Sequence, residues 1–233
     1  MILLRTRFFF ITGMLLFAGA LFPACSQDIN KPKRTLLWTL DWSPDDKYIA
    51  FGGDDSLLWV YDVAAMKMYK TIPMRNMVRK VAWSPDGKLL LVSTRDGAQI
   101  LDIENNKRIY LPGTGSARGM DWKPDGTLVA TITNQVMVWN LSGELVRTLR
   151  KEHKKSLFSV DWHPSKDLIV SSGDEIRIFD LSGKQLNMIK HREEPTGVLT
   201  VQWHPSGEFF ASGDYGHDNI ESIIQFWKED GTL

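Results

Sequence analysis

A tryptophan recurs about every 40 residues along this chain of 233 residues. The steps between successive copies are 41, 39, 40 and 41 residues, and a proline stands two residues after each tryptophan. A fixed period of this length is typical of arrays in which one small structural unit is stacked many times. The repeat tryptophans are Trp42, Trp83, Trp122, Trp162 and Trp203.

The copies contain four short runs of β-forming residues separated by turn signals, except the fifth, which contains three. In the second copy, the sequence Pro-Asp-Gly at 85–87 separates two such runs, and this order is typical of a tight turn. Three copies carry a second glycine turn, at Gly143, Gly183 and Gly231. Four strands per copy predict an all-β fold built of four-stranded antiparallel blades, a β-propeller. An aromatic side chain at one register would pack blade against blade, so the five tryptophans are expected to be structural.

With these motifs, the chain resembles the WD40-repeat family from Leu36 to Leu233. The copies are degenerate, since only three close with the family's Asp, at Asp62, Asp102 and Asp180. The resemblance implies a buried hydrogen-bonded set of His, Asp, Ser or Thr, and Trp within a blade. The candidate histidine is His153, and no single copy is expected to assemble the full set. The Trp-Ser-Pro-Asp-Gly motif is also similar to that of Tol-associated periplasmic propellers.

The fifth copy ends soon after its glycine turn, so its outer strand is predicted to be missing. A propeller normally removes its open edges by closing the ring. We therefore interpret the five visible repeats as part of a truncated, seven-bladed ring, which two further copies would complete. A five-bladed ring closed by an unusual strand is the alternative.

The first residues have the pattern of a targeting segment. An apolar run at 8–22 follows two arginines and leads to Cys25, the only cysteine of the chain. This cysteine resembles the lipidated residue of a bacterial lipobox, and the alternative is a free thiol beside the cleavage site. The resemblance implies export to the bacterial cell envelope, as a membrane-anchored lipoprotein or a periplasmic protein. The predicted boundaries are a signal peptide at 1–24, a tether at 25–34 and the propeller at 35–233.

Composition and motifs argue against most catalytic and nucleic-acid-binding classes. The 28 basic and 28 acidic residues cancel, which is unlike a protein with a large basic surface for nucleic acid. The sequence has no phosphate-binding loop, no zinc-protease motif and no nucleophile elbow. We therefore predict no catalytic residue, no metal site, no cofactor, no nucleic-acid partner and no small-molecule substrate.

Two groups of polar residues beside the repeat tryptophans leave alternatives open. His163 and His204 follow the tryptophan in adjacent copies, where they could share a metal or simply occupy a turn. An aspartate precedes the tryptophan in three copies. These carboxylates could line a central channel, or each could accept hydrogen bonds from a neighbouring blade, which we favour. They are Asp41, Asp121 and Asp161.

The fifth copy contains the most unusual stretch of the chain. The first four copies take 17 to 19 residues from the repeat tryptophan to the closing residue of the third run, and the fifth takes 24. The extra residues fall within 214–222, and long loops on a rigid scaffold frequently carry function. A protein or peptide partner is predicted to contact Asp214, Tyr215, His217, Asp218, Asn219 and Glu221.

Together these features predict a non-catalytic, envelope-anchored scaffold that binds a protein or peptide through propeller loops. One alternative is the propeller domain of an exported hydrolase or lactonase whose active residues lie beyond residue 233. Another is a Tol-like periplasmic accessory propeller. The fold alone does not separate these functions.

Overall fold

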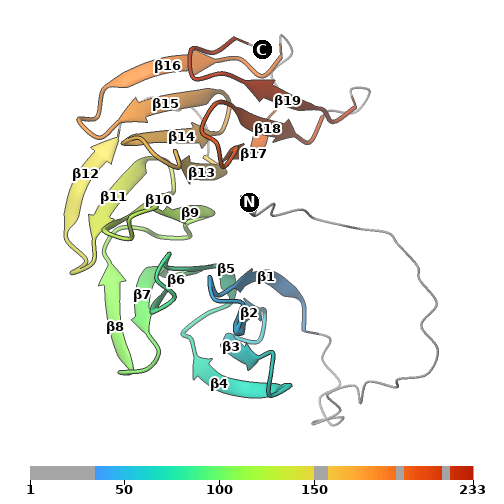
Figure 1. The fold of residues 1–233 in the computed structure, drawn as a ribbon, viewed down its shortest axis with the longest axis vertical. Coiled ribbons are helices and arrows are strands. Elements are labelled where there is room, and N and C mark those ends of the chain that lie inside the picture. Colours follow the sequence, from blue (N-terminus) through green and yellow to red (C-terminus); the bar gives the residue numbers. More distant parts are fainter. Residues whose placement is uncertain (1–34, 150–156, 193–196, 217–220, 233) are drawn as a thin grey trace, which may run out of the picture. The chain divides into compact units, whose positions relative to one another are not determined.

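The structure, a computed structural model, describes residues 35–149, 157–192, 197–216 and 221–232. These residues form β-strands and no helix, and the strands pair in sequence order into five antiparallel sheets, numbered here blades 1 to 5 (Figure 1). The predicted all-β architecture of WD40-type blades is confirmed. The predicted signal peptide, the tether and Cys25 lie outside the described residues and stay predictions.

Four blades have four strands, and blade 5 has three among the described residues. Blade 1 consists of β1 (Leu37–Trp42), β2 (Tyr48–Gly53), β3 (Leu57–Asp62) and β4 (Lys67–Pro73). Blade 2 consists of β5 (Val78–Trp83), β6 (Leu89–Thr94), β7 (Gly97–Asp102) and β8 (Lys107–Leu111). Blade 3 consists of β9 (Gly119–Trp122), β10 (Leu128–Ile132), β11 (Val136–Asn140) and β12 (Leu145–Leu149). Blade 4 consists of β13 (Ser159–Trp162), β14 (Leu168–Ser172), β15 (Ile176–Asp180) and β16 (Gln185–Ile189). Blade 5 consists of β17 (Val198–Trp203), β18 (Phe210–Asp214) and β19 (Ile224–Trp227).

The turn that follows the repeat tryptophan places a glycine in an unusual backbone conformation in blades 2, 3 and 5. Gly87, Gly126 and Gly207 have φ of 73° or 74°, in the left-handed region that favours glycine. The Gly87 N–H donates to the Ser84 carbonyl at 2.9 Å, which closes a four-residue turn. This turn reverses the chain between the first and second strands of a blade, as the Pro-Asp-Gly pattern predicts.

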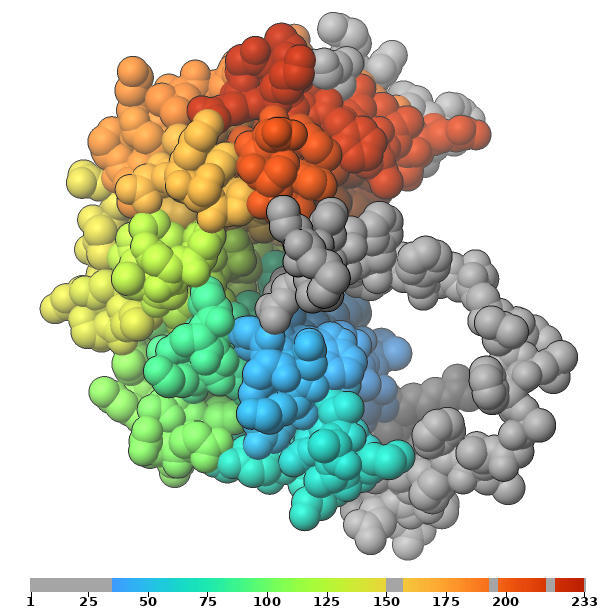
Figure 2. Space-filling view, viewed as in Figure 1, coloured from blue at the N-terminus to red at the C-terminus, as the bar shows by residue number. Residues whose placement is uncertain are grey.

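Successive blades pack through their first strands. β1 contacts β5, β5 contacts β9, β9 contacts β13, and β13 contacts β17. Figure 1 shows the fourth strands of blades 1 to 4 at the opposite edge of each of these blades, and in Figure 2 the colours follow the sequence from one blade to the next. Each blade is therefore one contiguous segment that packs against the next segment in the sequence.

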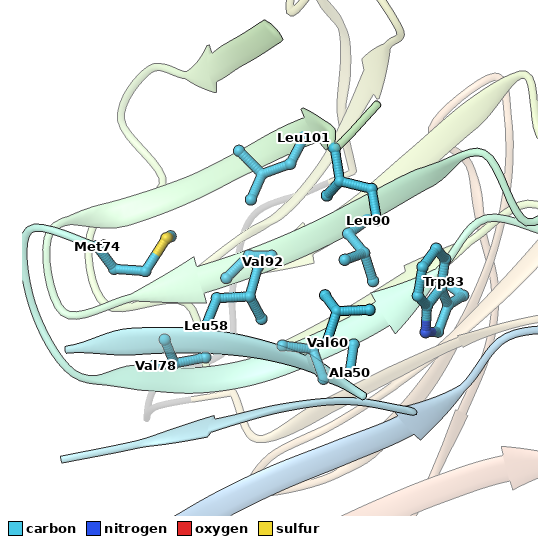
Figure 3. Close-up of a cluster of buried hydrophobic side chains, with 11 residues drawn as sticks. Ala50, Leu58, Val60, Met74, Val78, Trp83, Leu90, Val92 and Leu101 are labelled. Atoms are coloured by element: carbon cyan, nitrogen blue, oxygen red, sulfur yellow. The ribbon is translucent and has the colours of Figure 1, made fainter. Parts of the chain in front are cut away.

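The apolar core lies mainly between neighbouring blades. At the junction of blades 1 and 2, Leu58 and Val60 of β3 meet Val78 and Trp83 of β5 (Figure 3). Three further clusters have the same character. Burial of alternate apolar side chains against the next blade is the main source of stability for such an array.

The repeat tryptophans differ in burial according to their place in the array. The four in blades 2 to 5 are between 3% and 6% exposed, whereas Trp42 of blade 1 is 44% exposed. Each buried tryptophan lies where a preceding blade covers it, and none of the described residues covers Trp42 in that way. The covered tryptophans are Trp83, Trp122, Trp162 and Trp203.

Candidate functional site

The aspartates that precede the repeat tryptophans connect the blades. Asp41 Oδ2 accepts a hydrogen bond from the Trp83 N–H at 2.7 Å, one blade further on. Asp121 makes the same bond to the Trp162 N–H at 2.9 Å, and Asp161 to the Trp203 N–H at 2.7 Å. The favoured alternative therefore describes these carboxylates, because each accepts from a neighbouring blade. Hydrogen bonds to a charged acceptor are among the stronger ones in proteins.

The histidines beside the tryptophans occupy turns. His163 is buried, its Nδ1 accepts from the N–H groups of Ser165 and Lys166, and its Nε2 lies 3.0 Å from the Gly207 carbonyl of blade 5. Both ring nitrogens are therefore engaged by backbone groups, which leaves neither for a metal shared with His204. In the part of the chain that the structure describes, no group of three or more His, Cys, Asp or Glu side chains could hold a metal ion.

Blade 5 brings together the four residue types of the set that the resemblance implies, contrary to the expectation that no copy would, and hydrogen bonds join three of them. His191 Nδ1 lies 2.8 Å from Ser212 Oγ, and the same oxygen accepts from Trp227 Nε1 at 2.7 Å. His191 Nε2 lies 3.5 Å from Asp214 Oδ2. Burial is the main cause that lowers the pKa of His191, while the nearby Asp214 carboxylate opposes this effect. The histidine of the set in blade 5 is therefore His191. His153, the candidate in the copy of Trp162, lies outside the described residues and stays a prediction.

This set forms the base of the long loop in blade 5. The Asp214 side chain is fully buried, accepts from the Ile223 N–H at 2.9 Å and lies 2.8 Å from Arg192 Nε. Arg192 also donates to the Glu221 carbonyl at 2.9 Å. The first and last residues of the loop therefore lie next to the same buried carboxylate. The Asp214 carboxylate thus stabilises the two ends of the loop and does not face solvent.

The exposed residues of this loop begin with Tyr215. The Tyr215 side chain is 57% exposed, and Glu221 is exposed at the other end of the loop. The three remaining predicted contact residues, His217, Asp218 and Asn219, lie outside the described residues. Of the six residues predicted to contact a partner, Tyr215 and Glu221 are thus the described ones that reach solvent.

The neighbourhood of Tyr215 extends across three blades. A Cβ atom placed on Gly197 would lie 3.3 Å from Tyr215 Cε1 and 3.5 Å from Phe158 Cε2, so both rings border this glycine. The Arg118 guanidinium in turn lies 5.3 Å from the centre of the Phe158 ring, in the range of a cation–π contact. We call Arg118, Phe158 and Tyr215 the aromatic patch.

Two parts of this site are absent from the sequence-based prediction. Phe158 and Arg118 each stand four residues before a repeat tryptophan, a register that could have drawn attention to them. His191 stands twelve residues before Trp203, but the long loop separates its partners Asp214 and Trp227 in the sequence. The pairing of these residues becomes visible when β18 and β19 are placed side by side.

Comparison with known proteins places the repeats in a family. A model described as the anaphase-promoting complex subunit 4 WD40 domain matches residues 40–112. A model described as the WD domain, G-beta repeat, matches residues 143–180 and 183–227. The two models together match four of the five blades in large part.

Curated relatives are similar to parts of the chain. The ribosome biogenesis protein BOP1 homolog of Aedes aegypti is 29% identical over 82 residues, which are 35% of this chain and 10% of that protein. The APC/C activator protein CDC20 of Saccharomyces cerevisiae is 28% identical over 127 residues, 52% of this chain and 21% of that protein. The intraflagellar transport protein 80 homolog of Rattus norvegicus is 28% identical over 96 residues, 41% of this chain and 12% of that protein. The matches thus span about a tenth to a fifth of the relatives' own lengths.

These relatives correct the predicted location. They are eukaryotic proteins, and two of them are named for ribosome biogenesis and for activation of the APC/C. The prediction of a bacterial cell-envelope location, as a lipoprotein or in the periplasm, is therefore wrong. It depended on a short apolar run before one cysteine, a pattern with much less information than five repeats in register. The comparisons support neither a bacterial lipoprotein nor a Tol-associated type.

The described residues contain no helix that is long and apolar enough to cross a membrane. Both matched models describe WD40 repeats, and the described residues form the antiparallel blades expected of such repeats. The chain therefore belongs to the WD40-repeat family, whose repeats form scaffolds for interactions with other proteins.

Proposed function

We propose that this chain is a non-catalytic scaffold that binds a peptide or protein through the aromatic patch of blades 3 to 5. The observation that carries the proposal is the contact series from Arg118 to Phe158 and, across Gly197, to Tyr215. It combines an exposed cation with two aromatic rings. Tyrosine and arginine are enriched where proteins contribute most binding energy to a partner.

The chemistry of the patch favours a ligand with an apolar side chain next to a carboxylate. The rings of Phe158 and Tyr215 offer apolar area, and the tyrosine hydroxyl adds a hydrogen-bonding group. Arg118 is exposed and can pair with a carboxylate while it stays over the Phe158 ring. The buried pair of Asp214 and Arg192 holds the base of the Tyr215 loop, which limits the entropy lost on binding.

A peptide selection tests this function. Peptides that bind the wild-type protein are selected from a random library, and their affinities for Tyr215→Ala are then measured. We expect binding to weaken by about tenfold or more, because an aromatic anchor contributes at least about 1.4 kcal/mol. Point variants are preferable to replacing the loop at 214–222, because that change would also remove the buried Asp214 carboxylate.

The matched control is Tyr110→Ala. Tyr110 lies on β8, away from the patch, and is 53% exposed, close to the exposure of Tyr215. The centre of its ring is 5.8 Å from the Arg75 guanidinium. Its removal should leave peptide affinity unchanged. Equal effects of the two substitutions, or no effect of Tyr215→Ala and Phe158→Ala, would refute the proposed surface.

A further inference from the structure

A small cavity lies between blades 1 and 2, beside the turn that follows Trp83. Its volume is about 190 Å³, smaller than the roughly 300–1,000 Å³ of sites for drug-sized ligands. Two blades that pack against each other form this cavity, so it does not depend on where the array begins or ends. Its lining includes Tyr48, Trp83, Asp102, Ile103, Glu104 and Asn105.

The apolar part of the lining consists of two aromatic rings and one aliphatic side chain. Tyr48 of β2 and Trp83 of β5 are stacked, with ring centres 6.3 Å apart. Ile103 follows β7 and, like Trp83, is less than 9% exposed. Aromatic rings offer apolar area to a ligand, and their faces also attract a positive charge.

The polar part of the lining is the turn between β7 and β8, which carries two carboxylates. Asp102 accepts from the backbone N–H of Asn105 at 2.9 Å and from its side-chain amide at 2.8 Å. The bond from the Asn105 side chain is the largest cause that lowers the pKa of Asp102, with a smaller effect of the Lys107 charge. Glu104 accepts from the Tyr69 hydroxyl at 2.8 Å. Both carboxylates are therefore fixed in place beside the cavity.

The Glu104 carboxylate keeps acceptor capacity for a ligand. An ionised carboxylate offers about four acceptor sites, and among the described residues Tyr69 and Lys70 donate to Glu104. The other lysine beside the cavity, Lys88, lies 3.2 Å from Asp86 and is 79% exposed. A ligand with several N–H donors can therefore bond to Glu104 without displacing either lysine from its partner.

The turn of blade 2 differs from the matching turn of blade 3. In blade 3, the third residue after Asn140 is Gly143, where a Cβ atom would lie 2.7 Å from Ile109 of the preceding blade. In blade 2, the third residue after Asp102 is Asn105. Because Asn105 has a side chain, the turn of blade 2 cannot repeat this close approach to the preceding blade. The cavity occupies the junction beside this turn.

We propose that this cavity binds the guanidinium group of an arginine side chain from a peptide or protein partner. A planar guanidinium stacks on an aromatic ring and donates to carboxylates in a fork, which matches the two kinds of lining. The apolar stem of arginine can lie against Ile103. The ammonium of lysine is a compact and strongly hydrated charge, so it gains less from aromatic and aliphatic neighbours.

The cavity and the aromatic patch are separate sites. Trp83 is the last residue of β5, whereas Arg118 and Phe158 stand directly before β9 and β13. The two sites thus lie at opposite ends of the first strands. Loss of arginine binding at the cavity would leave the function proposed for the aromatic patch unaffected.

Three small probes test the ligand. N-acetyl-arginine amide, N-acetyl-citrulline amide and N-acetyl-lysine amide are titrated into the whole chain. NMR follows the indole N–H of Trp83 and the backbone N–H groups of 103–105. Citrulline keeps the length of arginine without its charge, and lysine keeps the charge without the planar fork. We expect the arginine probe to bind at least about tenfold more tightly than the other two.

Variants of the lining test the site. Glu104→Gln removes a charge and keeps an acceptor for Tyr69, and it should weaken the arginine probe by about threefold or more, as expected for an exposed ion pair. The matched control is Glu144→Gln, the same change at an exposed residue in the corresponding turn of blade 3, and it should leave affinity unchanged. Tyr48→Leu removes a ring, keeps an apolar side chain and should also weaken the arginine probe. Circular dichroism checks the fold of each variant.

Three results would overturn the assignment. The first is a Trp83 indole resonance that does not move with the arginine probe. The second is a citrulline or lysine probe that binds as tightly as arginine, which would show that the guanidinium is not recognised. The third is an equal effect of Glu104→Gln and Glu144→Gln on the affinity of the arginine probe.

Discussion

Two serines at the same register of blades 4 and 5 have opposite energetic roles. Ser212 stands nine residues after Trp203 and bonds both His191 and Trp227. Ser171 stands nine residues after Trp162, and its buried Oγ has no hydrogen-bond partner among the described residues. Among the described residues, Phe179, whose side chain has no N–H, occupies the place of the tryptophan in blade 4.

The substitution Ser212→Ala should lower the free energy of unfolding by about 1–3 kcal/mol, since it leaves buried donors without a partner. Ser171→Ala is the matched control and should change stability by less than about 0.5 kcal/mol, because it removes a hydroxyl for which the described residues supply no hydrogen-bond partner. Urea unfolding of both variants measures the difference. Equal losses would show that the hydrogen bonds of Ser212 contribute nothing beyond the packing of its side chain.

At the scale of elements, the turn between β13 and β14 is sensitive to pH. Burial is the largest cause that lowers the pKa of His163 from its ordinary value of 6.5, and the positive charge of Lys166 acts in the same direction. The Gly207 carbonyl and the Glu229 carboxylate oppose this effect. Protonation at Nδ1 would also break the two bonds from Ser165 and Lys166. The folded protein therefore favours the neutral imidazole.

This pKa shift predicts a loss of stability in mild acid. The unfolded chain protonates His163 as pH falls below about 6.5, before the folded protein does, so the unfolding free energy decreases from that pH downward. His163→Asn keeps an acceptor for the turn and does not titrate, so its stability should fall less between pH 7 and pH 5.5. Thermal unfolding at several pH values measures both slopes, and parallel slopes would contradict the assignment.

At the scale of the whole molecule, the position of a blade in the array determines how much its repeat tryptophan contributes to the free energy of unfolding. Trp122 is 5% exposed between blades, and its indole N–H donates to the Ala82 carbonyl at 3.0 Å. Trp42 is 44% exposed at the end of the array. The same residue at the same register therefore buries very different apolar areas.

The substitution Trp122→Ala should destabilise the protein by about 3–5 kcal/mol, as expected for a large side chain removed from a core. Trp42→Ala should cost less than about 2 kcal/mol, because less apolar area is lost. Denaturant titrations of the two variants give the comparison. A loss for Trp42→Ala as large as that for Trp122→Ala would contradict the difference in burial between the two side chains.

The sequence by itself determined the parts of the fold that depend on local sequence patterns. The period of the tryptophans, the Pro-Asp-Gly turns and the alternating apolar runs all act within about 40 residues. Strand formation and tight turns depend on neighbours at this range, so blades, strands and the membership of each blade followed from reading one copy after another. The inter-blade role of Asp41, Asp121 and Asp161 was also accessible, because their register repeats.

The tertiary structure alone decided which side chains meet across blades and loops. It paired His191 with Ser212 and Trp227, buried Asp214 beneath the loop predicted to contact a partner, and brought Arg118, Phe158 and Tyr215 into one patch. It also distinguished Trp42 from the other repeat tryptophans. The physical reason is the same in each case. Burial and hydrogen bonding depend on which surface covers a residue, and residues from different blades supply that surface.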